Sequence, residues 1–179
     1  MPTSSALDVW TTIALEAERE SPLWASILRP SAERDTVPVF SALCDPRFAL
    51  GVETIYEGYL VHYGRPRLFA PEDADSALLL GDYLYAHGLV RVAAEGNVDA
   101  VADLAELISL CSQLRSENTE GDGAAWAATA ALLGWHALES PRAALRVGGD
   151  AQPLLALARQ ARGEEAVELA LAAHSGRLR

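Results

Sequence analysis

Glu72, Asp73 and Asp75 are three acidic side chains that lie close together in the sequence and could hold a metal ion. Carboxylate oxygens are the ligands that Mg²⁺ and Ca²⁺ prefer in proteins. The same residues directly precede a long apolar segment that is predicted to be helical, and the helix dipole stabilises acids at a helix start. We therefore predict that they cap a helix and that the chain has no metal site.

Histidine and aspartate side chains near the middle of the chain could act in acid–base catalysis. His62 and His87 have no partner carboxylate at a spacing typical of a catalytic pair, so we expect both rings in the core or in a cleft. Asp82 lies within an apolar helical segment, and a buried aspartate needs hydrogen-bond donors. We predict that Asp82 anchors a neighbouring helix or loop, with a functional role as the alternative.

Two arginines, Arg65 and Arg67, follow a glycine and flank a proline. We predict a solvated loop here, and contact with an anion or a partner is the alternative. The sequence contains no Ser-His-Asp arrangement, P-loop or dinucleotide-binding fingerprint that would indicate another chemistry.

The composition is that of a folded, acidic protein. Half of the 179 residues are apolar and 22% are charged, with a formal net charge of −11. An acidic protein repels phosphate backbones and anionic lipids, so we expect no nucleic-acid partner and no binding to a membrane surface. Without a local basic pocket or a metal, the charge also disfavours a diphosphate substrate.

The cysteines and the first residues bear on localisation. Cys44 and Cys111 lie in apolar stretches with no CxxC motif, which predicts two buried free thiols and no zinc site. The first ten residues lack the basic and apolar regions of a signal peptide. We therefore expect a cytoplasmic protein.

Helical periodicity and capping signals predict an all-α fold. Ser21-Pro22, Asp45-Pro46 and Ser140-Pro141 each place a capping side chain before a proline. The expected helices cover about 6–18, 22–28, 39–43, 46–62, 73–95, 98–117, 124–138, 140–148, 153–160 and 164–173. We predict a single all-helical domain over 1–179 that ends in a helical hairpin over 150–179, with no membrane span.

Residues 48–138 carry motifs in a recognisable order. Glu53, Ile55, Leu60 and His62 match the pattern E-x-I-H-x-x-S-L-I-H, and the segment from Gly64 to Pro66 matches the end of R-R-G-x-P. The segment from Ala77 to Gly88 is similar to A-x-L-x-G-D-x-L-L-A-x-A. Further on, a G-Q-x-x-E pattern is matched at Gln113, and K-T-A-x-L at Thr129 without its lysine.

With these motifs the chain resembles the trans-isoprenyl diphosphate synthases (polyprenyl synthetase family). The resemblance implies a helical bundle of isoprenoid-synthase type, truncated at its C-terminal end. It also implies binding positions at Arg65, Asp82, Gln113 and Thr129.

The acids that the family uses for catalysis are missing from this sequence. His62 is followed almost directly by Gly64, where the family has its first aspartate-rich loop, and no second aspartate-rich segment follows Leu132. In the family these acids hold the Mg²⁺ ions that neutralise the leaving diphosphate. We therefore expect no catalytic residue, no metal and no cofactor in this chain.

The resemblance then implies a non-catalytic protein that acts as a dimerising or accessory subunit in isoprenoid biosynthesis. The partner would be a second copy or a catalytic prenyl synthase, and the contact would involve the segment from Ala77 to Gly88. One alternative is a helical protein that binds an isoprenoid or another lipid without reacting it. Another is a prenyltransferase that is active only in a heteromer or through relocated metal ligands.

Overall fold

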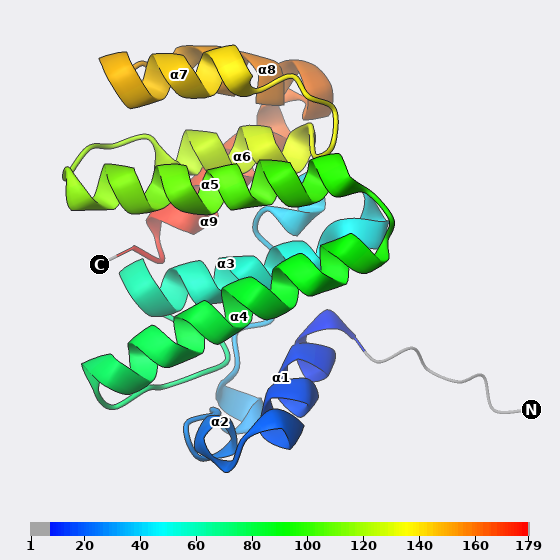
Figure 1. The fold of residues 1–179 in the computed structure, drawn as a ribbon, viewed down its shortest axis with the longest axis vertical. Helices are drawn as coiled ribbons and strands as arrows, with labels where there is room; N and C mark the ends of the chain where they lie inside the picture. Colours follow the sequence, from blue (N-terminus) through cyan, green and yellow to red (C-terminus); the bar gives the residue numbers. More distant parts are fainter. Residues whose placement is uncertain (1–7, 179) are drawn as a thin grey trace, which may run out of the picture.

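The computed structural model describes residues 8–178 and shows an all-α protein (Figure 1). The described chain contains no β-strand, and its extended pairing is limited to bridges between Leu28 and Phe69 and between Gly64 and Leu178. Nine α-helices follow one another within the described chain: α1 (Val9–Glu20), α2 (Pro22–Ser26), α3 (Ala49–Tyr63), α4 (Ala74–Ala94), α5 (Val98–Ser116), α6 (Asp122–Ala131), α7 (Glu139–Gly148), α8 (Gln152–Arg162) and α9 (Glu164–Ser175).

Several helices begin where the capping residues predict. Ser21 accepts a hydrogen bond from the backbone N–H of Leu23 at the start of α2, and Asp73 accepts one from the backbone N–H of Ser76 at the start of α4. Asp73 thus caps a helix, as expected of an acid at this position. The predicted first helix begins at Ala6, which lies outside the described residues, and α1 begins at Val9.

Several predicted helices differ from those in the structure. The segment expected to be helical over 124–138 forms α6 only over Asp122–Ala131, because the chain turns at Gly134 and His136, which both have positive φ. Ser140 caps no helix, since α7 already begins at Glu139 and its N-cap residue Leu138 offers no side-chain hydrogen bond. Residues 39–43, expected to be a short helix, contain only a 3₁₀ turn over Ser41–Leu43.

Helices α3 and α4 are packed unusually closely. Gly51 and Gly58 of α3 face Gly88 and Gly81 of α4, so the two helices run in opposite directions. A Cβ atom on Gly88 would lie 2.9 Å from the carbonyl oxygen of Gly51, and one on Gly58 would lie 3.0 Å from that of Gly81. Gly51 and Gly58 are seven residues apart in α3, as are Gly81 and Gly88 in α4. A spacing of seven residues returns to the same helix face after two turns. Glycine therefore allows the two backbones to approach each other along this face.

The helices are stacked in layers (Figure 1). The α1–α2 pair lies at one end, followed by α3 and α4, then by α5, α6 and α9, and α7 and α8 lie at the other end. The main core lies between α3, α5 and α6, and a second cluster packs α1 and α2 against α3 and α4. All ten residues of α6 are buried.

Aromatic side chains fill the space between α3 and α6. The ring centroid of Trp126 lies 5.0 Å from that of Tyr56, 5.6 Å from that of Tyr59 and 5.5 Å from that of Phe40. All four side chains are at most 1% exposed. The interior of the bundle is therefore occupied by the protein's own rings at this point.

Two further expectations from the sequence concern the thiols and the membrane. Cys44 and Cys111 are both buried and free, as predicted, and burial raises the pKa of the Cys44 thiol to about 12. None of the helices within residues 8–178 is long and apolar enough to cross a membrane.

Candidate functional site

Two of the four residues implied by the family resemblance lie on the surface. The guanidinium of Arg65 is exposed and donates a hydrogen bond to the carbonyl oxygen of Gly176. Asp82 is also exposed and lies 3.3 Å from Nε2 of His62. The prediction that Asp82 is buried is wrong, because it lies on the solvent side of α4, but it does contact the neighbouring helix α3 through His62.

The other two residues lie on different helices. Gln113 of α5 is half-buried and donates a hydrogen bond to Oε1 of Glu117 at 3.0 Å. Thr129 of α6 is fully buried, and its hydroxyl accepts a hydrogen bond from Nη2 of Arg142 at 3.2 Å. No hydrogen bond within residues 8–178 joins any two of the four residues, each of which has a different partner.

Arg67 forms the most deeply buried group of charges, although the sequence predicts a solvated loop at this position. Its Nη1 lies 2.7 Å from Oε2 of Glu53, and its Nε lies 3.0 Å from Oε2 of Glu57. All three side chains are at most 1% exposed. The solvated-loop prediction is wrong for Arg67 because two acids on the inner face of α3 bind its guanidinium inside the protein.

Backbone groups complete this group of charges, which we call the Arg67 triad (Glu53, Glu57 and Arg67). Oε1 of Glu57 accepts hydrogen bonds of 2.8 Å from the backbone N–H groups of Arg67 and Leu68. Oε1 of Glu53 accepts one from the hydroxyl of Ser41. Burial alone would lower the pKa of Arg67, but the two carboxylates raise it above its usual value. Arg67 therefore keeps its positive charge inside the protein.

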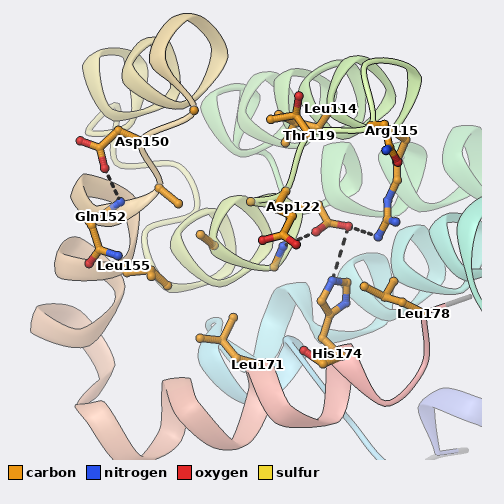
Figure 2. Close-up of a pocket in the computed structure, with 18 residues that line it drawn as sticks. Leu114, Arg115, Thr119, Asp122, Asp150, Gln152, Leu155, Leu171, His174 and Leu178 are labelled. Carbon is orange, nitrogen blue, oxygen red and sulfur yellow. Dashed lines mark hydrogen bonds and ion pairs between the residues drawn. The ribbon is translucent and has the colours of Figure 1, made fainter.

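A second group of polar side chains lies where α3, α5, α6 and α9 meet, and we call it the Asp122 cluster (Tyr59, Arg115, Asp122 and His174). Oδ2 of Asp122 accepts hydrogen bonds from the hydroxyl of Tyr59 and from Nη2 of Arg115. It also lies 3.6 Å from Nε2 of His174. Figure 2 shows His174 reaching from α9 toward Asp122, with Arg115 approaching from the α5 side. Side chains from α3, α5 and α9 thus surround one carboxylate of α6.

Local structure explains why Asp122 can occupy this position. Gly121 precedes it with a φ of +123°, a conformation that L side chains rarely adopt, and this directs the chain into α6. The carboxylate lies in the first turn of α6, where the helix dipole favours a negative charge. Its Oδ1 accepts a hydrogen bond of 3.0 Å from the backbone N–H of Gly123.

The cluster shifts the pKa values of its members in opposite directions. Burial would raise the pKa of Asp122, but the neighbouring ring of His174, the hydrogen bond from Tyr59 and the charge of Arg115 hold it well below its usual value. Burial, together with the charge of Asp122, raises the pKa of the Tyr59 hydroxyl. Asp122 is therefore a carboxylate and Tyr59 a neutral phenol at neutral pH.

An open pocket of about 750 Å³ lies beside the Asp122 cluster. The apolar part of its lining consists of Leu114, Leu155, Leu171 and Leu178 (Figure 2). Its polar lining includes Thr119, Asp150 and Gln152. The volume is within the range of pockets that bind small molecules.

The side chains of the Asp122 cluster bind mainly to one another. Nδ1 of His174 lies 2.9 Å from the hydroxyl of Tyr56, and Nε2 faces Asp122 without a hydrogen-bond partner. His174 is 2% exposed, and its two ring nitrogens face Tyr56 and Asp122. Burial also raises the pKa of Tyr56. The cluster fixes α9 to the core through the contacts of His174 with Tyr56 and Asp122.

The residues of the Asp122 cluster carry little signal in the sequence. Asp122 and Arg115 lie at the ends of helices, where acids and bases most often serve the helix dipole. His174 carries a signal that could have identified it: it continues the buried stripe of Val167 and Ala170 on α9, at spacings of three and four residues. A histidine on the buried face of a helix needs a polar partner, and here the partners are Tyr56 and Asp122.

Within residues 8–178 no three His, Cys, Asp or Glu side chains are grouped so that they could hold a metal ion. Comparison with models of protein families, with curated proteins and with solved structures gives no match for this chain.

Proposed function

We propose that this chain is a non-catalytic, dimerising protein of polyprenyl-synthase type that serves as an accessory subunit in isoprenoid biosynthesis in the cytoplasm. Its partner is a second copy of the chain, bound through the outer face of α4. The observation that carries the proposal is the apolar surface that α4 exposes, and the ordered motifs over 48–138 supply the family.

The outer face of α4 carries exposed apolar residues on both sides of the exposed Asp82. Leu78, Leu79 and Val90 are each more than half exposed, and Ala86 lies between them. Leu79, Ala86 and Val90 are spaced by seven and four residues, which places them on one side of the helix. An exposed apolar stripe of this kind marks a surface that binds another protein. Leu78, Leu79 and Ala86 lie in the segment through which the resemblance implies dimerisation, and Val90 lies just beyond it.

The buried acids support a role without catalysis. Glu53 and Glu57, which point inward from α3, are both bound by Arg67. Asp103 is bound by Arg142, and Asp122 by Arg115. Each of these carboxylates is neutralised by an arginine of the same chain, so none is available to hold Mg²⁺ for a diphosphate.

The aromatic packing between α3 and α6 argues against the alternative of a lipid carrier. A prenyl chain held in the bundle interior would have to displace Trp126, Tyr56 and Phe40, whose rings are stacked or in edge contact. Removing such rings from a packed core is costly, at about 3–5 kcal/mol for one large aromatic side chain. The subunit role needs no such rearrangement.

The test is the oligomeric state of the wild-type protein and of a Leu79→Arg variant, measured by sedimentation velocity. We expect the wild type to sediment as a dimer and the variant as a monomer, since an arginine in an apolar interface is left without a partner. Val147→Arg is the matched control, because Val147 is an exposed aliphatic residue on α7, in the layer farthest from α1 and α2.

A wild-type protein that stays monomeric at all concentrations would overturn the homodimer. Coexpression with a catalytic prenyl synthase of the same organism then tests the heteromer. If the two proteins do not copurify, or if Leu79→Arg leaves the complex unchanged, α4 is not the contact surface.

A further inference from the structure

Trp135 is exposed to an extent that is unusual for a large aromatic side chain. It is 74% exposed, whereas Trp24 and Trp126 are buried. It lies in the loop between α6 and α7, far along the chain from the apolar stripe of α4 (Figure 1). Aromatic residues that a protein holds in solvent are frequent anchors of ligand and protein binding.

Hydrogen bonds hold the loop around Trp135 in place. The backbone N–H of Gly134 donates to Oδ2 of Asp103 at 2.8 Å, and the N–H of Trp135 donates to the carbonyl oxygen of Leu132 at 3.1 Å. On the other side of Trp135, Nε2 of His136 lies 2.7 Å from Oδ1 of Asp99. The loop is therefore fixed on both sides of the tryptophan.

Asp103, which binds this loop, forms a buried ion pair with Arg142. Oδ1 of Asp103 accepts a hydrogen bond of 3.0 Å from Nη1 of Arg142, whose Nη2 also bonds to the hydroxyl of Thr129. Gly134 has a φ of +82°, and a Cβ atom there would lie 2.7 Å from Nδ2 of Asn97. A binding group whose position is fixed before the ligand arrives loses less entropy on binding.

A cleft of about 400 Å³ lies directly beside Trp135. Leu132 and Leu157 provide its apolar walls together with three alanines, and Gln160 and Arg162 are its polar members. Arg162 is the only charged residue in this lining, in a protein with a net charge of −11. Its single hydrogen bond among the described residues runs from Nε to the carbonyl oxygen of Ala131, at 3.3 Å.

From these observations we propose that the cleft binds a small, planar aromatic molecule that carries one negative charge. The aromatic ring stacks on Trp135 between the leucines, and the anionic group binds the guanidinium of Arg162. A mostly apolar cleft with one positive group selects this combination over a neutral apolar molecule and over a polyanion. The ligand class is independent of the proposed dimer, because α4 contributes nothing to the cleft.

The experiment uses 2-naphthoate as the probe and 2-naphthamide as its neutral counterpart of the same shape. Binding to the full chain is measured by titration calorimetry and by the ¹H–¹⁵N signal of the Trp135 indole. We expect saturable binding of 2-naphthoate with a Kd below about 1 mM, several-fold weaker binding of the amide, and a shift of the Trp135 signal.

Two variants and one control separate the parts of the site. Trp135→Ala should weaken binding of 2-naphthoate at least about tenfold through the lost stacking and apolar contact. Arg162→Gln should weaken binding of 2-naphthoate several-fold and leave that of the amide unchanged. Val147→Ala, at an exposed position outside the cleft, should change neither.

Several outcomes would overturn the proposal. No saturation in the wild type, or equal affinity of the wild type and Trp135→Ala, removes the site. Equal affinity for the two probes removes the charge from the ligand class. Self-association that Trp135→Ala abolishes would show that the cleft receives a second copy of the chain. The indole signal reports on the unaltered protein, so the test does not depend on the folding of any variant.

Discussion

The Arg67 triad and the Asp122 cluster both place charges against α3, but their side chains differ in how far solvent reaches them. In the triad every side chain is at most 1% exposed, and both carboxylates are bound by the guanidinium and by further donors. In the Asp122 cluster Arg115 is about one quarter exposed, and Nε2 of His174 lacks a hydrogen-bond partner. The two regions therefore differ in that the charges of the triad are shielded from solvent on all sides, whereas those of the Asp122 cluster are partly solvated.

The largest effect is expected at the triad. Arg67→Met would leave Glu53 and Glu57 buried without a cation, and we expect the free energy of unfolding to fall by about 3–5 kcal/mol. Urea denaturation of the purified protein measures this. A loss below about 1 kcal/mol would mean that water reaches the two carboxylates, and the distinction between the two regions would fail.

The Asp122 cluster should show a smaller effect that depends on pH. The pKa of Asp122 in the folded protein is below the ordinary value of 3.8, so the carboxylate contributes stability that is present above pH 3.8 and lost as the pH falls below it. We expect Asp122→Asn to lower the free energy of unfolding by about 1–3 kcal/mol at neutral pH. The difference between the two proteins should shrink at about pH 3.

Urea denaturation of both proteins at several pH values is the measurement for Asp122. Taking the difference between them removes the contribution of the other carboxylates, which titrate in both proteins. A difference that stays constant down to about pH 3 would show that the charge of Asp122 does not stabilise the fold.

The smallest effect is expected at Arg65, two residues from the triad. Its exposed guanidinium bonds only to the carbonyl oxygen of Gly176 among the described residues, so Arg65→Met should change the free energy of unfolding by about 0–1 kcal/mol. The same urea denaturation as for Arg67→Met makes the two a matched pair. Equal losses for the two variants would contradict the contrast between buried and exposed arginines.

The sequence was sufficient to predict the helices that carry strong local signals. Asp73 and Ser21 cap helices as expected because capping depends on residues within one turn. The end of α6 could not be predicted, since the apolar composition continues to Leu138 while the chain turns at Gly134. That turn depends on Asp103, which lies 31 residues earlier in the chain.

The candidate sites were harder to predict than the helices. Arg67 resembles a loop residue because it follows Gly64 and Pro66, and its partners Glu53 and Glu57 are 14 and 10 residues away. These charges are brought together by the return of the chain along α3 after Gly64. Trp135 gave no signal of exposure either, since its local sequence is that of a buried helix.

The contact of α9 with α3 has a consequence for how the protein folds. The hydroxyl of Tyr56 in α3 forms a hydrogen bond with the ring of His174 in α9, which lies 118 residues later in the chain. Gly64 pairs with Leu178 in the same region. Contacts between such distant parts of a chain form slowly, because a long loop must close before they stabilise anything. During synthesis on the ribosome, the aromatic side chains between α3 and α6 therefore lack the cover of α9 until that helix has emerged. An incomplete chain exposes this apolar surface to chaperones and to other nascent chains.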